Sequence, residues 1–405
     1  MSFVVPSWSS PTIPQTLRFD IGAVERAARH AIRSVSQGTE AIIRNSVDDI
    51  GAIWDSTSAC LREIDEIRVR ISNRAIEYHT VAIRTLVDAG VLPVQLIDDV
   101  WRRVAPDLVR PVNARLFRLL NPRAAVWGSQ PPSFVQVTDS ASIGLDSRSF
   151  FFVHGMDYLA DPNDAYQYMY RQFEQEVRLF HEDSNECNDT GCNVYLLSYD
   201  SKLTDELDTI IRLGFETELG GPVVGLAPGL FLAVLWRELE RRAQVAGDHL
   251  HTLLSPLPRG IDNGLFLFSH SLGGIVSAHM ANRIYSENPN DGGLFRAWYC
   301  MAAAIPANGF QRTGEFLYAP FLTRGEAKTE VYYSFFDDIL STAYVLANSH
   351  LAMGNVGSGV RRPDTSIRNR DTTALSREVH MIGGPAGGYF SRVGELIRRD
   401  FGIHP

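Results

Sequence analysis

The sequence predicts an α/β fold, a doubly wound and mostly parallel sheet, preceded by an all-helical N-terminal domain. Beyond about residue 131, short apolar runs that suit buried strands alternate with helical patterns, as in the βαβ units of a parallel sheet. Before that point, apolar residues recur at helical spacing. We therefore divide the chain into an irregular arm at 1–16, a helical domain at 17–130 and an α/β domain at 131–405.

The composition allows a fold of this size and narrows the functions to consider. With 405 residues, of which 45% are hydrophobic, the chain can bury a large core. The net charge of -9 comes without a dominant basic patch, so we expect no nucleic-acid partner. The four cysteines are too few for a disulfide framework, although Cys187 and Cys192 are spaced to close a small loop in an oxidising compartment. No further cysteine or histidine pair lies near them at ligand spacing, so we expect no metal.

The first part of the chain is expected to be an arm followed by helices. Residues 1–16 are rich in serine and proline and lack the features of a secretory signal, so we expect cytoplasmic residence. We interpret 17–130, with a last helix at 94–120, as a domain that packs on itself and on the α/β domain. Binding of a membrane surface or a partner by its arginine-bearing polar face stays open. Its apolar stripe includes Ile50, Trp54, Leu61, Ile64, Ile71 and Ala75.

The periodicity changes from helical to strand-like after the proline-containing segment at 128–132. Helices are then expected at 165–179, 237–254 and 339–348, and an irregular segment at 353–373. The expected strands share short apolar runs and lie at 134–137, 147–153, 193–199, 265–270, 295–304, 330–335 and 377–381.

One of these strands ends in a motif that carries chemistry. The apolar run at 265–270 stops at Ser271, and a helix resumes at Gly273, which predicts a strand, a sharp turn and a helix with the serine at the apex. A strained turn of this kind needs small residues two positions before and after the serine, here Ser269 and Gly273. A plain βα turn or a phosphate-cradling loop is the alternative interpretation.

The sequence Ser-His-Ser-Leu-Gly-Gly at 269–274 resembles the nucleophile elbow of the α/β-hydrolase superfamily, in its lipase and esterase branch. The common pattern of that elbow is Gly-x-Ser-x-Gly, and Ser269 stands where the first glycine is usual. The resemblance implies an α/β-hydrolase fold, with Ser271 as the nucleophile. It also implies that the backbone N–H of Leu272 is one donor of an oxyanion hole.

A second motif, His154-Gly155-Met156, follows the expected strand at 147–153. The carboxyl ends of parallel strands meet at one rim of the sheet, so this motif and Ser271 are expected on the same rim. The motif resembles the oxyanion loop of hydrolases, which implies that the backbone N–H of Met156 is the second donor. Glycine lets the backbone approach the substrate. We expect His154 to hold the loop by packing and hydrogen bonding, and a plain turn is the alternative.

The acid of a catalytic triad is expected after the strand at 330–335. Hydrolases of this class carry their acid after such a strand, and Asp337 matches that position best, with Asp338 directly behind it. The carboxylate must accept the imidazole Nδ1–H, which fixes the tautomer and stabilises the imidazolium. Capping of the helix at 339–348 is the alternative role for one of the two aspartates.

The general base is expected to be His380, at the end of the last strand and in front of a glycine-rich loop. The order serine, aspartate, histidine along the chain is that of the α/β-hydrolase triad. His350 and His404 are the competing histidines downstream of the acid.

Together the motifs imply a serine hydrolase that cleaves carboxylic esters, of the lipid or acyl kind, through an acyl-enzyme and without a cofactor. An acyltransferase or amidase with the same triad stays open, as does a non-catalytic membrane- or partner-binding protein on the same scaffold. Insertions at about 213–262 and 305–327 are interpreted as lids or as packing segments. The apolar segment at 222–236 and the helical domain are the expected sites of any peripheral membrane contact.

Overall fold

The computed structural model describes the α/β domain and a short stretch before it. The arm at 1–16, most of the predicted helical domain and Asp338 lie outside the described residues. So do residues 213–226 of the first predicted lid. The described residues are 111–156, 158–181, 192–202, 227–259, 264–288, 293–337, 339–348, 350–359, 367–377, 379–382 and 388–401.

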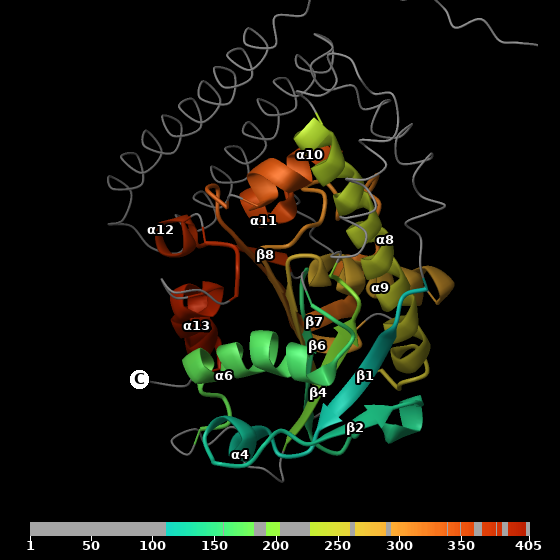
Figure 1. Cartoon of the computed structure of the whole chain (residues 1–405). Helices are drawn as coiled ribbons and strands as arrows, with labels where there is room; N and C mark the ends of the chain where they lie inside the picture. Colours follow the sequence, from blue (N-terminus) through green and yellow to red (C-terminus); the bar gives the residue numbers. More distant parts are fainter. Residues whose placement is uncertain are drawn as a thin grey trace, which may run out of the picture.

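The strands of this region form one eight-stranded sheet in the order β2-β1-β4-β3-β5-β6-β7-β8 (Figure 1). From β4 to β8 the neighbours run parallel, and β1 runs antiparallel to both β2 and β4. The predicted α/β architecture with a mostly parallel sheet is confirmed. The strands are β1 Ala114–Leu119, β2 Phe134–Val137, β3 Arg148–Val153, β4 Cys192–Tyr199, β5 Leu265–His270, β6 Phe295–Met301, β7 Thr323–Tyr333 and β8 Ile367–Asp371.

Helices cover both faces of the sheet, because successive residues of a buried strand point to opposite faces. On β5, Leu265 and Leu267 pack with α8 Ala227–Leu254 and α9 Gly273–Glu287 in one apolar cluster. Phe266 and Phe268 pack with α6 Arg171–Val177 and α13 Tyr389–Asp400 in a second cluster on the other face. A strand that reads as continuously apolar is therefore buried on both sides, as a doubly wound sheet requires.

Shorter helical segments connect these layers. They are α4 Pro122–Val126, α5 Pro162–Ala165, the π-helical turn η2 Tyr166–Tyr170, η1 Ser140–Ser142, η4 Ala319–Leu322, the π-helical turn η5 Leu340–Tyr344, α10 Val345–Asn348, α11 Met353–Val356 and α12 Thr373–Ser376. The helices expected at 165–179 and 339–348 are thus present, each combining a π-helical and an α-helical part.

The helix predicted at 94–120 is wrong over its last residues, which form β1. Arg115 and Arg118 lie three residues apart, a spacing that suits a helix face, and the run is only six residues long. Pairing decided the outcome, since β1 lies between β2 and β4 and both of its edges are hydrogen-bonded. The sheet therefore begins before residue 131, where the α/β domain was expected to start.

The predicted strand at 377–381 is also wrong. The last strand is β8 Ile367–Asp371, and α12 follows it, so residues 379–382 lie in a loop. The strand reads Ile-Arg-Asn-Arg-Asp and has no apolar run, because it is an edge strand that is only partly buried. The segment 353–373 accordingly contains α11 and β8 and is not irregular throughout.

The two predicted lids contain packed structure. Residues 227–254 of the first form α8, whose buried side chains, among them Trp236 and Leu239, belong to the main apolar cluster. In the second, Ile305, Phe310 and Phe316 are buried in the same cluster, and residues 323–327 belong to β7. The described part of both segments is thus well packed, and the lid interpretation stays a prediction.

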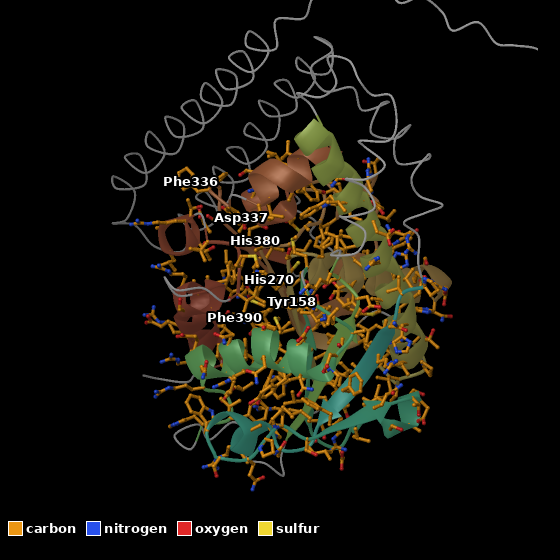
Figure 2. All side chains as sticks on the ribbon, viewed as in Figure 1. Tyr158, His270, Phe336, Asp337, His380 and Phe390 are labelled. Atoms are coloured by element: carbon orange, nitrogen blue, oxygen red, sulfur yellow. The ribbon has the colours of Figure 1, made fainter. Side chains whose placement is uncertain are left out.

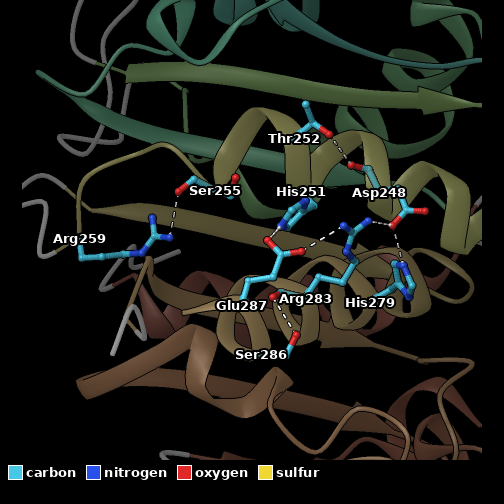
Figure 3. Close-up of polar contacts among 9 residues, drawn as sticks. All are labelled: Asp248, His251, Thr252, Ser255, Arg259, His279, Arg283, Ser286 and Glu287. Carbon is cyan, nitrogen blue, oxygen red and sulfur yellow. Dashed lines mark hydrogen bonds and ion pairs between the residues drawn. The ribbon is translucent and has the colours of Figure 1, made fainter. Parts of the chain in front are cut away.

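A polar network joins α8 to α9 on the outer side of this layer (Figure 3). The carboxylate of Asp248 accepts hydrogen bonds from His279 and Arg283, and Glu287 pairs with Arg283 and His251. The two helices approach closely at Gly247, where a Cβ would lie 2.8 Å from the carbonyl oxygen of Val276. We call Asp248, His251, His279, Arg283 and Glu287 the α8–α9 clamp.

Candidate active site

Ser271 lies at the apex of the predicted elbow, directly between the end of β5 and the start of α9. Its φ is 54°, a left-handed conformation that side chains rarely adopt. The turn is held by its backbone: the N–H of Ser271 donates to the carbonyl of Met301 at 3.0 Å. Its carbonyl accepts from Gly274 at 2.9 Å and from Ala304 at 3.1 Å. Three main-chain bonds thus stabilise a conformation that the residue alone would avoid.

The small residues around the serine are explained by close approach. A Cβ at Gly273 would lie 2.4 Å from the carbonyl oxygen of Val153, so α9 begins directly against the end of β3. Ser269, in the place of the usual glycine, is fully buried, and its Oγ accepts a hydrogen bond from Trp298 Nε1 at 2.8 Å. The departure from the common pattern is therefore accommodated by a polar partner on β6, which satisfies the added hydroxyl.

The three predicted triad residues meet in one hydrogen-bonded chain. His380 Nε2 lies 2.8 Å from Ser271 Oγ, and His380 Nδ1 lies 2.7 Å from Asp337 Oδ2. Each of the three residues is at most 2% exposed. With the serine O–H donating to Nε2 and Nδ1–H donating to the carboxylate, this is the arrangement of a nucleophile, a base and an orienting acid.

The elements that bring these residues together are far apart in sequence. Ser271 follows β5, Asp337 follows β7, and His380 follows α12 at the same end of the sheet. Figure 2 shows Asp337 and His380 near one another above the sheet, with His270 beneath them. The carboxyl ends of parallel strands form this rim, as predicted.

Asp337 makes the contacts that both of its predicted roles require. Its Oδ2 faces His380, while its Oδ1 accepts the backbone N–H of Leu340 at 3.0 Å at the start of the following helical turn. Its carbonyl accepts from the N–H and the Oγ of Ser341, which fixes the main chain. Both carboxylate oxygens are therefore held by hydrogen bonds, one to His380 and one to the main chain.

The proposed oxyanion donors flank Ser271. A Cβ at Gly155 would lie 2.8 Å from Ser271 Cβ and 3.4 Å from its Oγ, so the loop after β3 touches the serine and requires glycine there. Met156 is the next residue of that loop, and Leu272 begins the turn into α9. The main chain at both predicted positions thus lies beside the nucleophile.

His154 holds this loop, as the sequence predicted. Its Nδ1 donates to the carbonyl of Gly155 at 3.0 Å, and its Nε2 accepts the backbone N–H of Tyr199 at 3.3 Å. The ring stacks on Tyr199 with centroids 4.5 Å apart. Burial lowers the pKa of His154 to about 4, only partly offset by the hydrogen bond to Gly155, so the ring is neutral at neutral pH.

Of the two competing histidines, only His350 lies among the described residues, and it contacts neither Ser271 nor Asp337 there. His350 lies 3.4 Å from the hydroxyl of Tyr344, and His404 lies outside the described residues. His270, to which the sequence analysis assigned no role, is buried with its ring centroid 5.1 Å from that of His380. Its position directly before Ser271 was the only signal of this proximity.

Other features of the described residues bear on cofactors and compartment. They contain no cluster of three or more side chains that could hold a metal, and none of their helices has the length and apolarity to cross a membrane. Cys192 is disulfide-bonded, with its partner outside the described residues.

Comparison with known protein families and with curated proteins found no match to this chain.

Proposed function

We propose that this protein is a serine hydrolase of the α/β-hydrolase type that cleaves carboxylic esters. The observation that carries the proposal is the continuous chain from Ser271 through His380 to Asp337, with the serine held in a strained turn between strand and helix. A histidine that orders a buried aspartate on one side and faces a serine hydroxyl on the other is arranged for proton transfer.

In the proposed reaction, Ser271 Oγ attacks the ester carbonyl carbon while His380 Nε2 takes its proton. The N–H groups of Met156 and Leu272 stabilise the negative charge that develops on the carbonyl oxygen. The tetrahedral intermediate collapses, and the imidazolium gives its proton to the leaving alcohol, which leaves an acyl-enzyme. Water activated by His380 then releases the acid and restores the serine. Asp337 keeps the imidazole in its reactive tautomer throughout.

Exposed apolar side chains beside the triad favour an acyl or lipid ester as substrate. Phe336 is 46% exposed next to Asp337, and Met381 is 41% exposed next to His380. Leu375, on the helix that leads to His380, is 43% exposed. These exposed apolar residues are neighbours in sequence of Asp337 and His380 or lie on the helix before His380, and they support a substrate with an apolar chain.

The alternatives are not excluded by these residues. An acyltransferase or an amidase uses the same triad, and analysis of the products separates them from an esterase. The non-catalytic interpretation would have gained support from a His380 remote from Ser271, and the 2.8 Å separation argues against it. Membrane contact through the helical domain and the apolar segment at 222–236 stays a prediction. Cytoplasmic residence also stays one, and the disulfide at Cys192 argues against a reducing compartment.

Labelling with a fluorophosphonate probe tests the proposal, because the probe reacts with activated serines. We expect an adduct on the peptide that contains Ser271, lost in Ser271→Ala, and hydrolysis of p-nitrophenyl esters that improves with acyl chain length. The matched control is Ser277→Ala, on the helix that follows, since Ser277 is buried outside the triad. Folded wild-type protein that neither labels nor hydrolyses these esters, with or without detergent, contradicts the proposal.

A further inference from the structure

The histidine that acts as the base lies in a loop and not at the end of a strand. His380 sits between α12 and α13. Main-chain bonds anchor the loop on both sides, from Val379 to the carbonyl of Ser376 and from Tyr389 to the carbonyl of Met381, each 2.9 Å long. Proton transfer tolerates little displacement, so a loop residue needs further contacts that fix its own position.

His270 supplies such a contact from the rigid part of the fold. It is the last residue of β5, is 3% exposed, and its ring centroid lies 5.1 Å from that of His380 (Figure 2). The ring also meets Tyr389 edge-on, with ring centroids 5.2 Å apart. His270 is therefore packed against both the base and the first residue of α13.

Only one of the two ring nitrogens of His270 has a hydrogen-bond partner. Its side chain donates a hydrogen bond to the main chain of His380, while its buried Nε2 has no partner. The donor is therefore Nδ1–H, and the free lone pair on Nε2 identifies the tautomer. A side chain selected only to fill space would be apolar, because burying an unpartnered nitrogen is unfavourable.

The charge state of His270 suits a residue beside a base. Burial lowers its pKa well below the usual value, and the neighbouring His380 lowers it further, which outweighs the hydrogen bond to the main chain. His270 consequently stays neutral when His380 takes the proton of Ser271. It contacts the imidazolium without adding a like charge.

We propose that His270 is a positioning residue for the general base: from the end of β5, it holds the main chain and the ring of His380 at the distance from Ser271 that proton transfer requires. This inference rests on the proposed hydrolase function. It assigns to the residue before the nucleophile a role that acts through the base and does not involve contact with the substrate.

Two amide variants and one apolar variant test the role. His270→Asn places an N–H close to the position of Nδ1, His270→Gln places it near Nε2, and His270→Phe keeps the ring without any N–H. We expect His270→Phe and His270→Gln to lower kcat on p-nitrophenyl butyrate by about 10- to 100-fold, with KM changed less than about twofold. His270→Asn should recover most of the loss. His279→Phe, in the α8–α9 clamp, is the control and should match wild type.

The pattern among variants decides the outcome. Wild-type kcat in His270→Phe overturns the inference, and so does an Asn variant as slow as the Gln variant. If the Phe variant does not fold, the comparison of Asn with Gln still decides, because the two amides differ only in where the N–H lies. A loss of thermal stability that is equal in all variants, without the difference in kcat, also overturns it.

A proton NMR measurement tests this inference separately from the proposed function. In proton NMR spectra, the His380 Nδ1–H that bonds to Asp337 should give a strongly downfield resonance. We expect it to shift or broaden in His270→Phe and to persist in His270→Asn. An unchanged resonance in His270→Phe overturns the inference. If wild-type protein shows the resonance but does not label with fluorophosphonate, the hydrolase proposal fails, while this arm still tests the role of His270.

Discussion

Two histidine–aspartate pairs in this protein have almost the same separation and different surroundings. His380 and Asp337 are 2.7 Å apart with side chains 1% exposed, whereas His279 and Asp248 are 2.9 Å apart with side chains 24% and 46% exposed (Figure 3). Contact between the two groups is common to both pairs. What distinguishes the first is burial and a serine at the second ring nitrogen.

The surroundings of the second pair suit a link between helices. Burial acts to raise the pKa of Asp248, but its hydrogen bonds to Arg283 and His279, with their charges, outweigh it and hold the pKa below its usual value. The carboxylate is thus shared by two partners on α9. Ion pairs with this exposure contribute little to stability and less in salt.

The sharpest test of the comparison changes the same atom in both pairs. Asp337→Asn should lower kcat by about 10⁴-fold, because the amide cannot accept Nδ1–H and the imidazole loses its reactive tautomer. Asp248→Asn should leave kcat unchanged. Measurement of kcat on a p-nitrophenyl ester, with circular dichroism to confirm folding, checks both variants. Equal effects of the two substitutions would show that the burial of the first pair has no catalytic meaning.

A pair of glycines extends the contrast. A Cβ at Gly155 would lie 2.8 Å from Ser271 Cβ, and a Cβ at Gly247 would lie 2.8 Å from the Val276 carbonyl oxygen. Gly155→Ala should displace the oxyanion loop and reduce kcat by about 10²- to 10³-fold. Gly247→Ala should instead lower the thermal midpoint and leave kcat near that of wild type. Steady-state kinetics and thermal denaturation of both variants separate the two effects, and a fully active Gly155→Ala contradicts the oxyanion assignment.

Acid should destabilise the buried loop of His154 before it affects the exposed α8–α9 clamp. The pKa of His154 is about 4 in the folded protein, against the ordinary value of 6.5 that applies to the unfolded chain, so the unfolded chain binds the proton first as pH falls. Burial of neutral His154 therefore contributes fully to the free energy of unfolding above pH 6.5. As the pH falls from 6.5 to 4, the free energy of unfolding should decrease by about 3 kcal/mol. The lowered pKa of Asp248 keeps its own carboxylate charged throughout that range.

Denaturant unfolding at a series of pH values measures this loss. His154→Phe retains a ring against Tyr199 but has no proton to gain, so its stability should fall less steeply than that of wild type between pH 6.5 and 4. The difference between the two proteins cancels the titration of other buried groups, such as Glu174, whose pKa is raised to about 7 by burial despite the hydrogen bonds that lower it. Parallel pH profiles for the two proteins would contradict the burial argument.

The three candidate triad residues, which the structure brings together, were easier to predict than the strands that carry them. Ser271 was identified because an elbow combines an apolar strand, small flanking residues and a helix within about ten positions. His380 was identified by chain order and a following glycine-rich loop, although its predicted strand is wrong. Chain order survives an error in secondary structure, since the topology of the sheet fixes which ends meet.

What could not be predicted depends on partners distant in sequence. The strand β1 has arginines at helical spacing, and only its pairing with β2 and β4 makes it extended. The edge strand β8 has no apolar run because it is only partly buried. The contact of His270 with His380 joins residues far apart along the chain, and the place of His270 directly before Ser271 is the only local sign of it. Tertiary contacts override local preference in each case.

Because the backbone at Ser271 is left-handed, the residue found at this position should depend on whether the proposed chemistry is still under selection. Glycine adopts a φ of 54° without strain, so drift in a lineage released from the proposed chemistry would favour glycine at 271. We expect selection to keep a serine in that conformation where the proposed chemistry needs its hydroxyl. Among diverging descendants of this chain, the residue at 271 should therefore separate those that still turn over substrate from those that have kept only the fold.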